Sequence, residues 1–220
     1  MTFSLAGRCA RTGMLGAIVT TSSIAVGSRC CFAAAGIGAA LTQHTTDPRL
    51  GPLMLDQLRR RCTVEQAIGA AVGGTPRSDR RQLALIDVEG RTASFSGAAV
   101  KPERAEAHGS DCVAIANIVR SDTIPAAMVK AFEADPAAPL AVRLIAALEA
   151  GQAAGGEFKP LVSAGLVVAH REVFPYVDLR VDSHGDPIGT LHRLWGEYEP
   201  LADMYVARAV HPDSVIDPVM

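Results

Sequence analysis

Strand-like stretches in this sequence come in groups of two or three, and pairs of helix-like stretches separate the groups. The strand-like stretches are short and apolar, and they lie at residues 3–8, 14–21, 36–43, 83–88, 92–96, 112–119, 163–169 and 176–181. The helix-like stretches carry apolar residues at helical spacing and begin near residues 47, 63, 123, 139 and 186. A doubly wound parallel sheet needs strict alternation of strands and helices, so this grouping argues against it and favours separate α and β layers.

The strands are apolar on both faces, so each sheet must be covered on both sides. Two mainly antiparallel sheets stacked on each other, with helices outside, meet this demand, and the predicted fold class is therefore α+β. About half of the 220 residues are hydrophobic, which is enough for one full core. We expect a single domain over residues 1–220, with residues 209–220 as a flexible tail.

Helix boundaries are marked by residues that favour caps and breaks. Thr63 with Gln66 three positions later is typical of a capping box, and Gly73 with Gly74 is expected to end that helix. In the last helix, which begins near residue 186, Pro200 is expected to break or restart the helical run.

Composition excludes several partners. A formal net charge of −2 and few aromatic residues give no reason to expect nucleic acid or an anionic membrane, and no apolar stretch reaches the length of a membrane span. The cysteines are odd in number and lack the Cys-x-x-Cys spacing of disulfide frameworks or zinc sites: Cys9, Cys30, Cys31, Cys62 and Cys112. These features indicate a cytoplasmic protein.

The common nucleotide, zinc-protease, serine-hydrolase and dinucleotide motifs are absent, so we expect no cofactor. The first remaining group of chemically capable residues is Thr2 with Thr21 and Ser22 at the end of the second strand. A tight hairpin over Arg11-Thr12-Gly13 would bring these hydroxyls beside Thr2. If Met1 is removed, the free amine of Thr2 can take the proton of its own hydroxyl. The alternative is an ordinary strand end with side-chain to backbone hydrogen bonds.

A second group lies on the last strand. Asp178, Arg180 and Asp182 share one face, because side chains alternate along a strand, and His184 follows them. The row is either a solvated face or a polar site at a pocket or interface between copies. Asp182 and His184 alone do not define a metal site, so we expect no metal.

A third group consists of polar residues at or near strand ends: Gln43, His44, His108 and Asn117. Lone histidines such as His108 are more often structural or exposed. Asn117 follows a buried apolar run, where its amide needs partners and could donate a hydrogen bond to an oxyanion.

Several stretches together resemble a bacterial and archaeal family of uncharacterised proteins with the fold of N-terminal-nucleophile (Ntn) hydrolases. The most specific is the sequence Pro-Tyr-Val-Asp-Leu-Arg-Val-Asp at residues 175–182, and the resemblance covers about residues 2–198. The other matching stretches are at residues 1–4, 25–27, 35–39, 42–43, 148–151 and 153–156.

The resemblance implies a four-layer αββα sandwich. In related Ntn hydrolases the N-terminal residue attacks an amide carbonyl, its own amine is the base, and the acyl-enzyme is then hydrolysed, a role that falls by position on Thr2. Proteasome-like relatives place an acid after the second strand and a lysine on the third, whereas this chain has Thr21-Ser22 and small apolar residues there. The expected function is amide hydrolysis of a small molecule by a homodimer, and the alternative is a non-catalytic binding or assembly protein.

Overall fold

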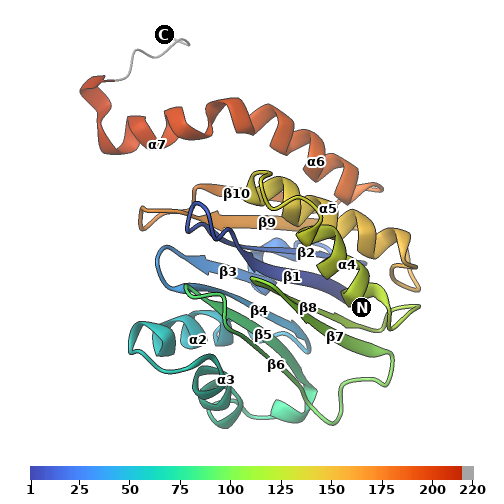
Figure 1. The fold of residues 1–220 in the computed structure, drawn as a ribbon. Coiled ribbons are helices and arrows are strands. Elements are labelled where there is room, and N and C mark those ends of the chain that lie inside the picture. The colour runs from blue at the N-terminus through green and yellow to red at the C-terminus, as the bar shows by residue number, and fades with distance from the viewer. Residues whose placement is uncertain (215–220) are drawn as a thin grey trace.

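The computed structural model describes residues 1–214, and its strands form two antiparallel sheets (Figure 1). The first sheet has the order β10-β9-β2-β1-β8-β7, and the second has the order β3-β4-β5-β6. The strands of the first sheet are β1 (Thr2–Arg8), β2 (Leu15–Thr21), β7 (Arg104–Gly109), β8 (Cys112–Asn117), β9 (Ser163–Ala169) and β10 (Val177–Val181). Those of the second are β3 (Cys31–Ala34), β4 (Gly38–His44), β5 (Arg81–Asp87) and β6 (Thr92–Ser96).

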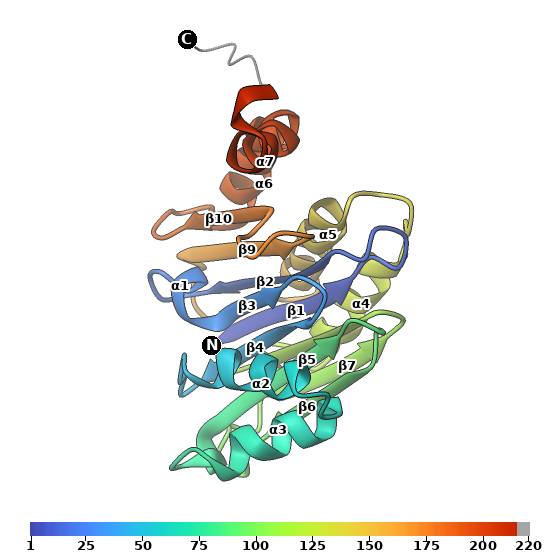
Figure 2. The same cartoon turned by 90° about the vertical axis from the view of Figure 1, so that its left-hand side faces the viewer.

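Helices cover the outer face of each sheet (Figure 2). The first sheet packs against α4 (Ile124–Glu133), α5 (Leu140–Ala153) and α6 (Pro187–Tyr198). The second packs against α2 (Leu50–Arg59) and α3 (Val64–Gly73). A third apolar cluster, which includes Ala6, Leu41 and Ile115, lies between the two sheets. The α+β, four-layer αββα prediction is therefore confirmed.

Strand β1 shows how the sequence divides its residues between these layers. Phe3 and Leu5 are fully buried with the apolar residues of α4 and α5, whereas Ala6 belongs to the cluster between the sheets. Ser4 also points to the second sheet, because its hydroxyl donates to Gln43 on β4. The same alternation puts the side chain of Thr2 on the inter-sheet side, at the end of the strand.

Most predicted elements are confirmed within a few residues, including the capping box between Thr63 and Gln66. Three elements were missed: the short helix α1 (Gly27–Cys30) and the strands β3 and β7. Strand β7 lies at a sheet edge and is only partly buried, so its sequence lacks an apolar run. Strand β3 has four residues, too few to show a period.

The C-terminal part contains a last helix and short 3₁₀ turns. Helix α6 is followed by a short 3₁₀ turn at Glu199–Leu201 and then by α7 (Ala202–Val210), so the restart predicted at Pro200 is confirmed. Within the tail expected at residues 209–220, α7 continues to Val210 and Pro212–Ser214 form another 3₁₀ turn. Residues 215–220 of that predicted tail lie outside the described residues.

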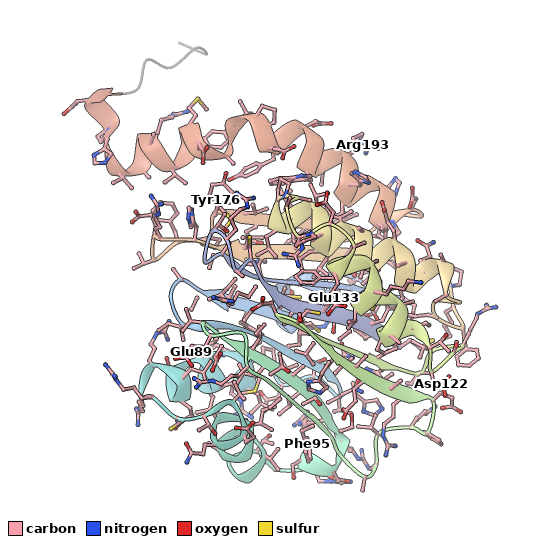
Figure 3. All side chains as sticks on the ribbon, in the orientation of Figure 1. Glu89, Phe95, Asp122, Glu133, Tyr176 and Arg193 are labelled. Atoms are coloured by element: carbon pink, nitrogen blue, oxygen red, sulfur yellow. The ribbon has the colours of Figure 1, made fainter. Side chains whose placement is uncertain are left out.

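Helix α7 extends past the body of the sandwich (Figures 1 and 2). Tyr176, which is labelled in Figure 3, ties it to the body: its hydroxyl donates to Asp203 of α7 at 3.0 Å. Within residues 1–214, no helix combines the length and the apolar character that crossing a membrane requires.

Candidate active site

Thr2 lies between two of the residues that the sequence placed near it. In the first sheet, β1 is flanked by β2 and β8, and Thr2 is directly opposite Asn117 of β8. Its hydroxyl oxygen is 3.3 Å from that of Thr21 at the end of β2, and both hydroxyls donate to the carbonyl oxygen of Met1. Thr2 is 7% exposed. The hairpin therefore brings Thr2 and Thr21 together, as predicted.

The segment after β2 is held in place by Ser163 of β9. The Ser163 hydroxyl donates to the carbonyl oxygen of Ser23 at 2.6 Å and accepts from the backbone N–H of Val26 at 3.1 Å. Close contact of Gly27 with Gly165 brings α1 onto the sheet, since a Cβ on Gly165 would lie 2.5 Å from the Gly27 Cα. These contacts fix the position of the residues that follow Thr21.

A buried polar network continues from β1 into the second sheet. Ser4 donates to the Oε1 of Gln43 at 2.8 Å, and the Gln43 amide donates to the Oε1 of Gln82 at 2.7 Å. The same Gln82 oxygen accepts from the Asn117 amide at 3.0 Å. Ser4, Gln43, Gln82 and Asn117 have no exposed surface. Because such groups are costly to bury without partners, the network fixes the register of the two sheets beneath Thr2.

Gln82 is the centre of this network, and the sequence did not single it out. Its own amide donates to the Ser96 hydroxyl at 3.1 Å and to the carbonyl oxygen of Ala116 at 3.0 Å. The Oδ1 of Asn117 is buried and has no hydrogen-bond partner in the described structure. Asn117 thus donates one amide hydrogen to Gln82, and its Oδ1 and second amide hydrogen remain available on the strand beside Thr2.

The structure adds an acid, Glu157, that the sequence had not placed here. One of its oxygens, Oε2, accepts from the backbone N–H of Ser22 at 2.9 Å, so that amide is already engaged. The other oxygen, Oε1, is buried without a partner in the described part of the chain. The backbone of Glu157 forms a bridge to Val119, just beyond β8. Glu157 therefore brings a carboxyl group to the place after the second strand where the sequence has only Thr21-Ser22.

Burial controls the charge of this acid. Glu157 is 5% exposed, and loss of solvation raises its pKa to about 7, opposed by the hydrogen bond from Ser22 and by the nearby amine of Met1. Burial also lowers the pKa of the Met1 amine, and the charge of Glu157 acts in the other direction. Groups whose pKa values are shifted by burial and by each other's charge are typical of catalytic sites.

The raised pKa predicts a specific dependence of stability on pH. An acid whose pKa is about 7 when folded and 4.5 when unfolded favours the folded state most below pH 4.5, and this contribution is lost as pH rises to about 7. In protein that retains Met1, we expect Glu157→Gln to match the wild type near pH 5 and to exceed its free energy of unfolding at pH 8 by up to about 3 kcal/mol. Urea denaturation at both pH values measures the difference.

The exposed acid Glu106 offers the matched control. Glu106→Gln should leave the difference in free energy between pH 5 and pH 8 as in the wild type. A Glu157→Gln variant that follows the wild-type pH dependence would contradict the assignment of a buried, titrating carboxyl group.

The second group of predicted residues lies away from Thr2. Asp178 and Arg180 form a two-pronged ion pair, with both N–O distances 2.8 Å, on the edge strand β10. Strands β9 and β2 separate β10 from β1, which corresponds to about 14 Å at the usual strand spacing. The pair is partly exposed. Arg180 packs against Gly27, and the carbonyl oxygen of Asp182 accepts from the backbone of Ala25, so the row supports the segment around α1.

The predicted histidines are also elsewhere. His184 lies at the start of α6, where its Nδ1 is 3.0 Å from the Thr190 hydroxyl. His44 contacts the carbonyl oxygen of Arg80 at 2.9 Å. His108 joins the edges of the two sheets through the hydroxyls of Thr92 and Ser94. Among residues 1–214, no cluster of three or more His, Cys, Asp or Glu side chains could hold a metal ion.

Comparisons with known proteins place the sequence in a family. A model described as a family of unknown function, DUF1028, matches residues 2–191. The crystal structure of a DUF1028 protein from Silicibacter pomeroyi is similar, with a TM-score of 0.83 and 29% identity over 90% of this chain and 85% of that one. The ancestral β-subunit Anbu from Yersinia bercovieri is a more distant match, with a TM-score of 0.41 and 12% identity over 93% and 96% of the two chains. No curated protein matches.

Proposed function

The chain belongs to the DUF1028 family of unknown function, and we propose that it is an Ntn-type amidohydrolase that acts on a small amide or acyl substrate through Thr2. The observation that carries the proposal is the place of the Thr2 hydroxyl: it lies at the first residue of a central strand, 3.3 Å from the Thr21 hydroxyl. An N-terminal threonine there needs no histidine, because its own amine is the base.

The reaction begins when the bond between Met1 and Thr2 has been cleaved. The Thr2 oxygen attacks the substrate carbonyl carbon, and the hydroxyl proton moves to the α-amine of Thr2. Negative charge develops on the carbonyl oxygen of the substrate. The proposed donors to this oxygen are the Thr21 hydroxyl and the remaining amide hydrogen of Asn117, which lie on the two strands beside Thr2. The backbone N–H of Ser22 is not one of these donors, because it already donates to the Glu157 carboxyl group. Ser22 therefore only helps to position the site.

The intermediate then collapses. The C–N bond breaks, the departing amine takes the proton from the Thr2 ammonium, and an ester remains on the Thr2 oxygen. Water attacks this ester while the α-amine accepts a proton, and release of the acid product restores the hydroxyl. Gln43 supports the site through Ser4 and Gln82, and the reaction needs no metal or cofactor. All five cysteines are free thiols, which supports the proposed cytoplasmic location.

The intact mass of the purified protein tests the first condition. We expect the species that begins at Thr2 to predominate, because a threonine amide has no free amine to serve as base. If nearly every molecule keeps a residue attached to the Thr2 nitrogen, the proposed hydrolase is wrong. A Thr2→Val variant keeps the shape of the side chain and lacks the hydroxyl. It is the control that shows whether Met1 is removed when the proposed nucleophile is absent.

A non-catalytic binding or assembly function is the second candidate, and the C-terminal arm favours it. Helix α7 lies beyond residue 191, where the family match ends, and carries exposed apolar side chains at Tyr205 and Val210. A cavity of about 290 Å³ lies between α7 and the turn after β9, with Phe174 and Tyr176 in its lining. The proposed homodimer would cover these side chains. Light scattering of a chain that ends at residue 200 measures its molar mass and so tests whether the dimer needs α7.

A further inference from the structure

Glu157 closes the first sheet beyond the N-terminal end of β1. Strand β1 lies between β2 and β8, and it begins at Thr2. Its two neighbours continue as Ser22 on one side and Val119 on the other. Glu157 joins both, through the 2.9 Å hydrogen bond from the Ser22 N–H and the backbone bridge to Val119. The carboxyl group therefore lies in line with β1, ahead of its first residue.

One oxygen of this carboxyl group is uncommitted. Oε1 has no hydrogen-bond partner in the described structure, although the side chain is almost completely buried. A buried carboxylate oxygen without a donor is costly, and a positively charged donor at the start of β1 would remove that cost. Arg120 does not serve, because its Nε donates to the backbone oxygen of Glu157 at 2.8 Å.

We propose that Glu157 binds the α-ammonium group of Thr2 once the Met1–Thr2 bond is cleaved. Its function in catalysis rests on the proposed hydrolase. When the hydroxyl proton of Thr2 moves to the α-amine, an ammonium group forms, and the carboxylate stabilises it until the proton passes to the leaving amine. Glu157 thereby supplies the acid that proteasome-like relatives place after the second strand.

Other charged groups face the same position. Lys101, from the connection between β6 and β7, and Lys159 lower the pKa of the Met1 amine, whereas the Cys30 thiol on α1 raises it when ionised. The two lysines and burial thus favour the neutral amine, and Glu157 favours the ammonium form. Glu157 is the largest influence that raises the pKa of the Met1 amine, so removing its charge should lower the pKa of an amine at the start of β1.

The test measures the titration of the Thr2 amine directly. The full chain is produced behind a leader that a site-specific protease removes to leave Thr2 first. The protein is then acetylated with limiting acetic anhydride from pH 5 to pH 10, and the peptide containing residues 2–8 is quantified by mass spectrometry. We expect the midpoint of labelling to fall by about one pH unit or more in Glu157→Gln, with no shift in Glu106→Gln.

An unchanged midpoint in a folded Glu157→Gln protein would overturn the pairing. Glu157→Asp keeps the charge and shortens the side chain, so its midpoint should lie between those of the wild type and Glu157→Gln, and it serves as the second variant if the first is unfolded. The readout does not depend on the Thr2 hydroxyl. A shifted midpoint in a protein whose Thr2 hydroxyl fails to react would retain the pairing and refute only the hydrolase.

Discussion

Replacing Thr2 by alanine is expected to abolish covalent labelling of the N-terminal residue by a β-lactone probe, with a loss of about a thousand-fold or more in rate. The reason is that the Thr2 oxygen is the proposed nucleophile, and alanine keeps the amine without that oxygen. The measurement uses protein that begins at residue 2 and follows the adduct by mass spectrometry. Hydroxylamine cleaves an ester on the hydroxyl and leaves an amide on the amine, so it identifies the atom that reacted.

Two variants control this experiment. Thr2→Ser retains a hydroxyl and should retain labelling. Thr20→Ala removes a hydroxyl from the neighbouring, fully buried position, where Thr20 donates to the carbonyl oxygen of Ser163 and faces away from Thr2. It should label at the wild-type rate despite a modest loss of stability. Equal hydroxylamine-sensitive labelling of the wild type and Thr2→Ala would refute the nucleophile.

Replacing Gln82 by alanine should cause the largest loss of stability among the polar variants, about 3 kcal/mol or more. Gln82 accepts from Gln43 and Asn117 and donates to Ser96 and to the backbone of Ala116, all inside the sandwich. Alanine would leave these groups without partners and open a cavity between the sheets. Urea denaturation at constant pH measures the change in the free energy of unfolding.

Gln152 on α5 provides the comparison, because its side chain is exposed. Gln152→Ala should change the free energy of unfolding by no more than about 0.5 kcal/mol. A loss below about 1 kcal/mol in Gln82→Ala would show that water replaces the network and that it does not fix the sheets. In that case the apolar core alone, and not the hydrogen bonds of the network, would hold the two sheets together beneath Thr2.

Local patterns accounted for most of the secondary structure. The predicted stretches at residues 92–96 and 163–169 coincide with β6 and β9, because short alternating or continuous apolar runs are typical of strands. Strand β7 escaped prediction because its residues Arg104–Gly109 are only partly buried and include charged and polar side chains, so they form no apolar run. The extent of α7 also escaped prediction, since a helix that lies outside the core carries a weak signal.

Some parts of the candidate site could likewise be predicted from the sequence, and others could not. Thr2 and Thr21 could be joined from the sequence because a hairpin relates the start of one strand to the end of the next. The Asp178–Arg180 pair was recognised as a row on one strand face, but only the order of strands in the sheet showed that it lies three strands from Thr2. The relation of a strand to its own hairpin partner is local, whereas the order of strands across a sheet is not.

The sequence by itself determined the layers of the sandwich and the place of Thr2 at the start of a strand, beside the end of its hairpin partner, because apolar strand runs and a short turn indicate both. Only the tertiary structure decided which residues surround that threonine. Glu157 is separated from Ser22 by most of the chain, and its carboxyl group reaches the end of β1 only because β9 pairs with β2. Its burial, its unpaired oxygen and its raised pKa are properties of that assembled environment, which no local pattern of residues records.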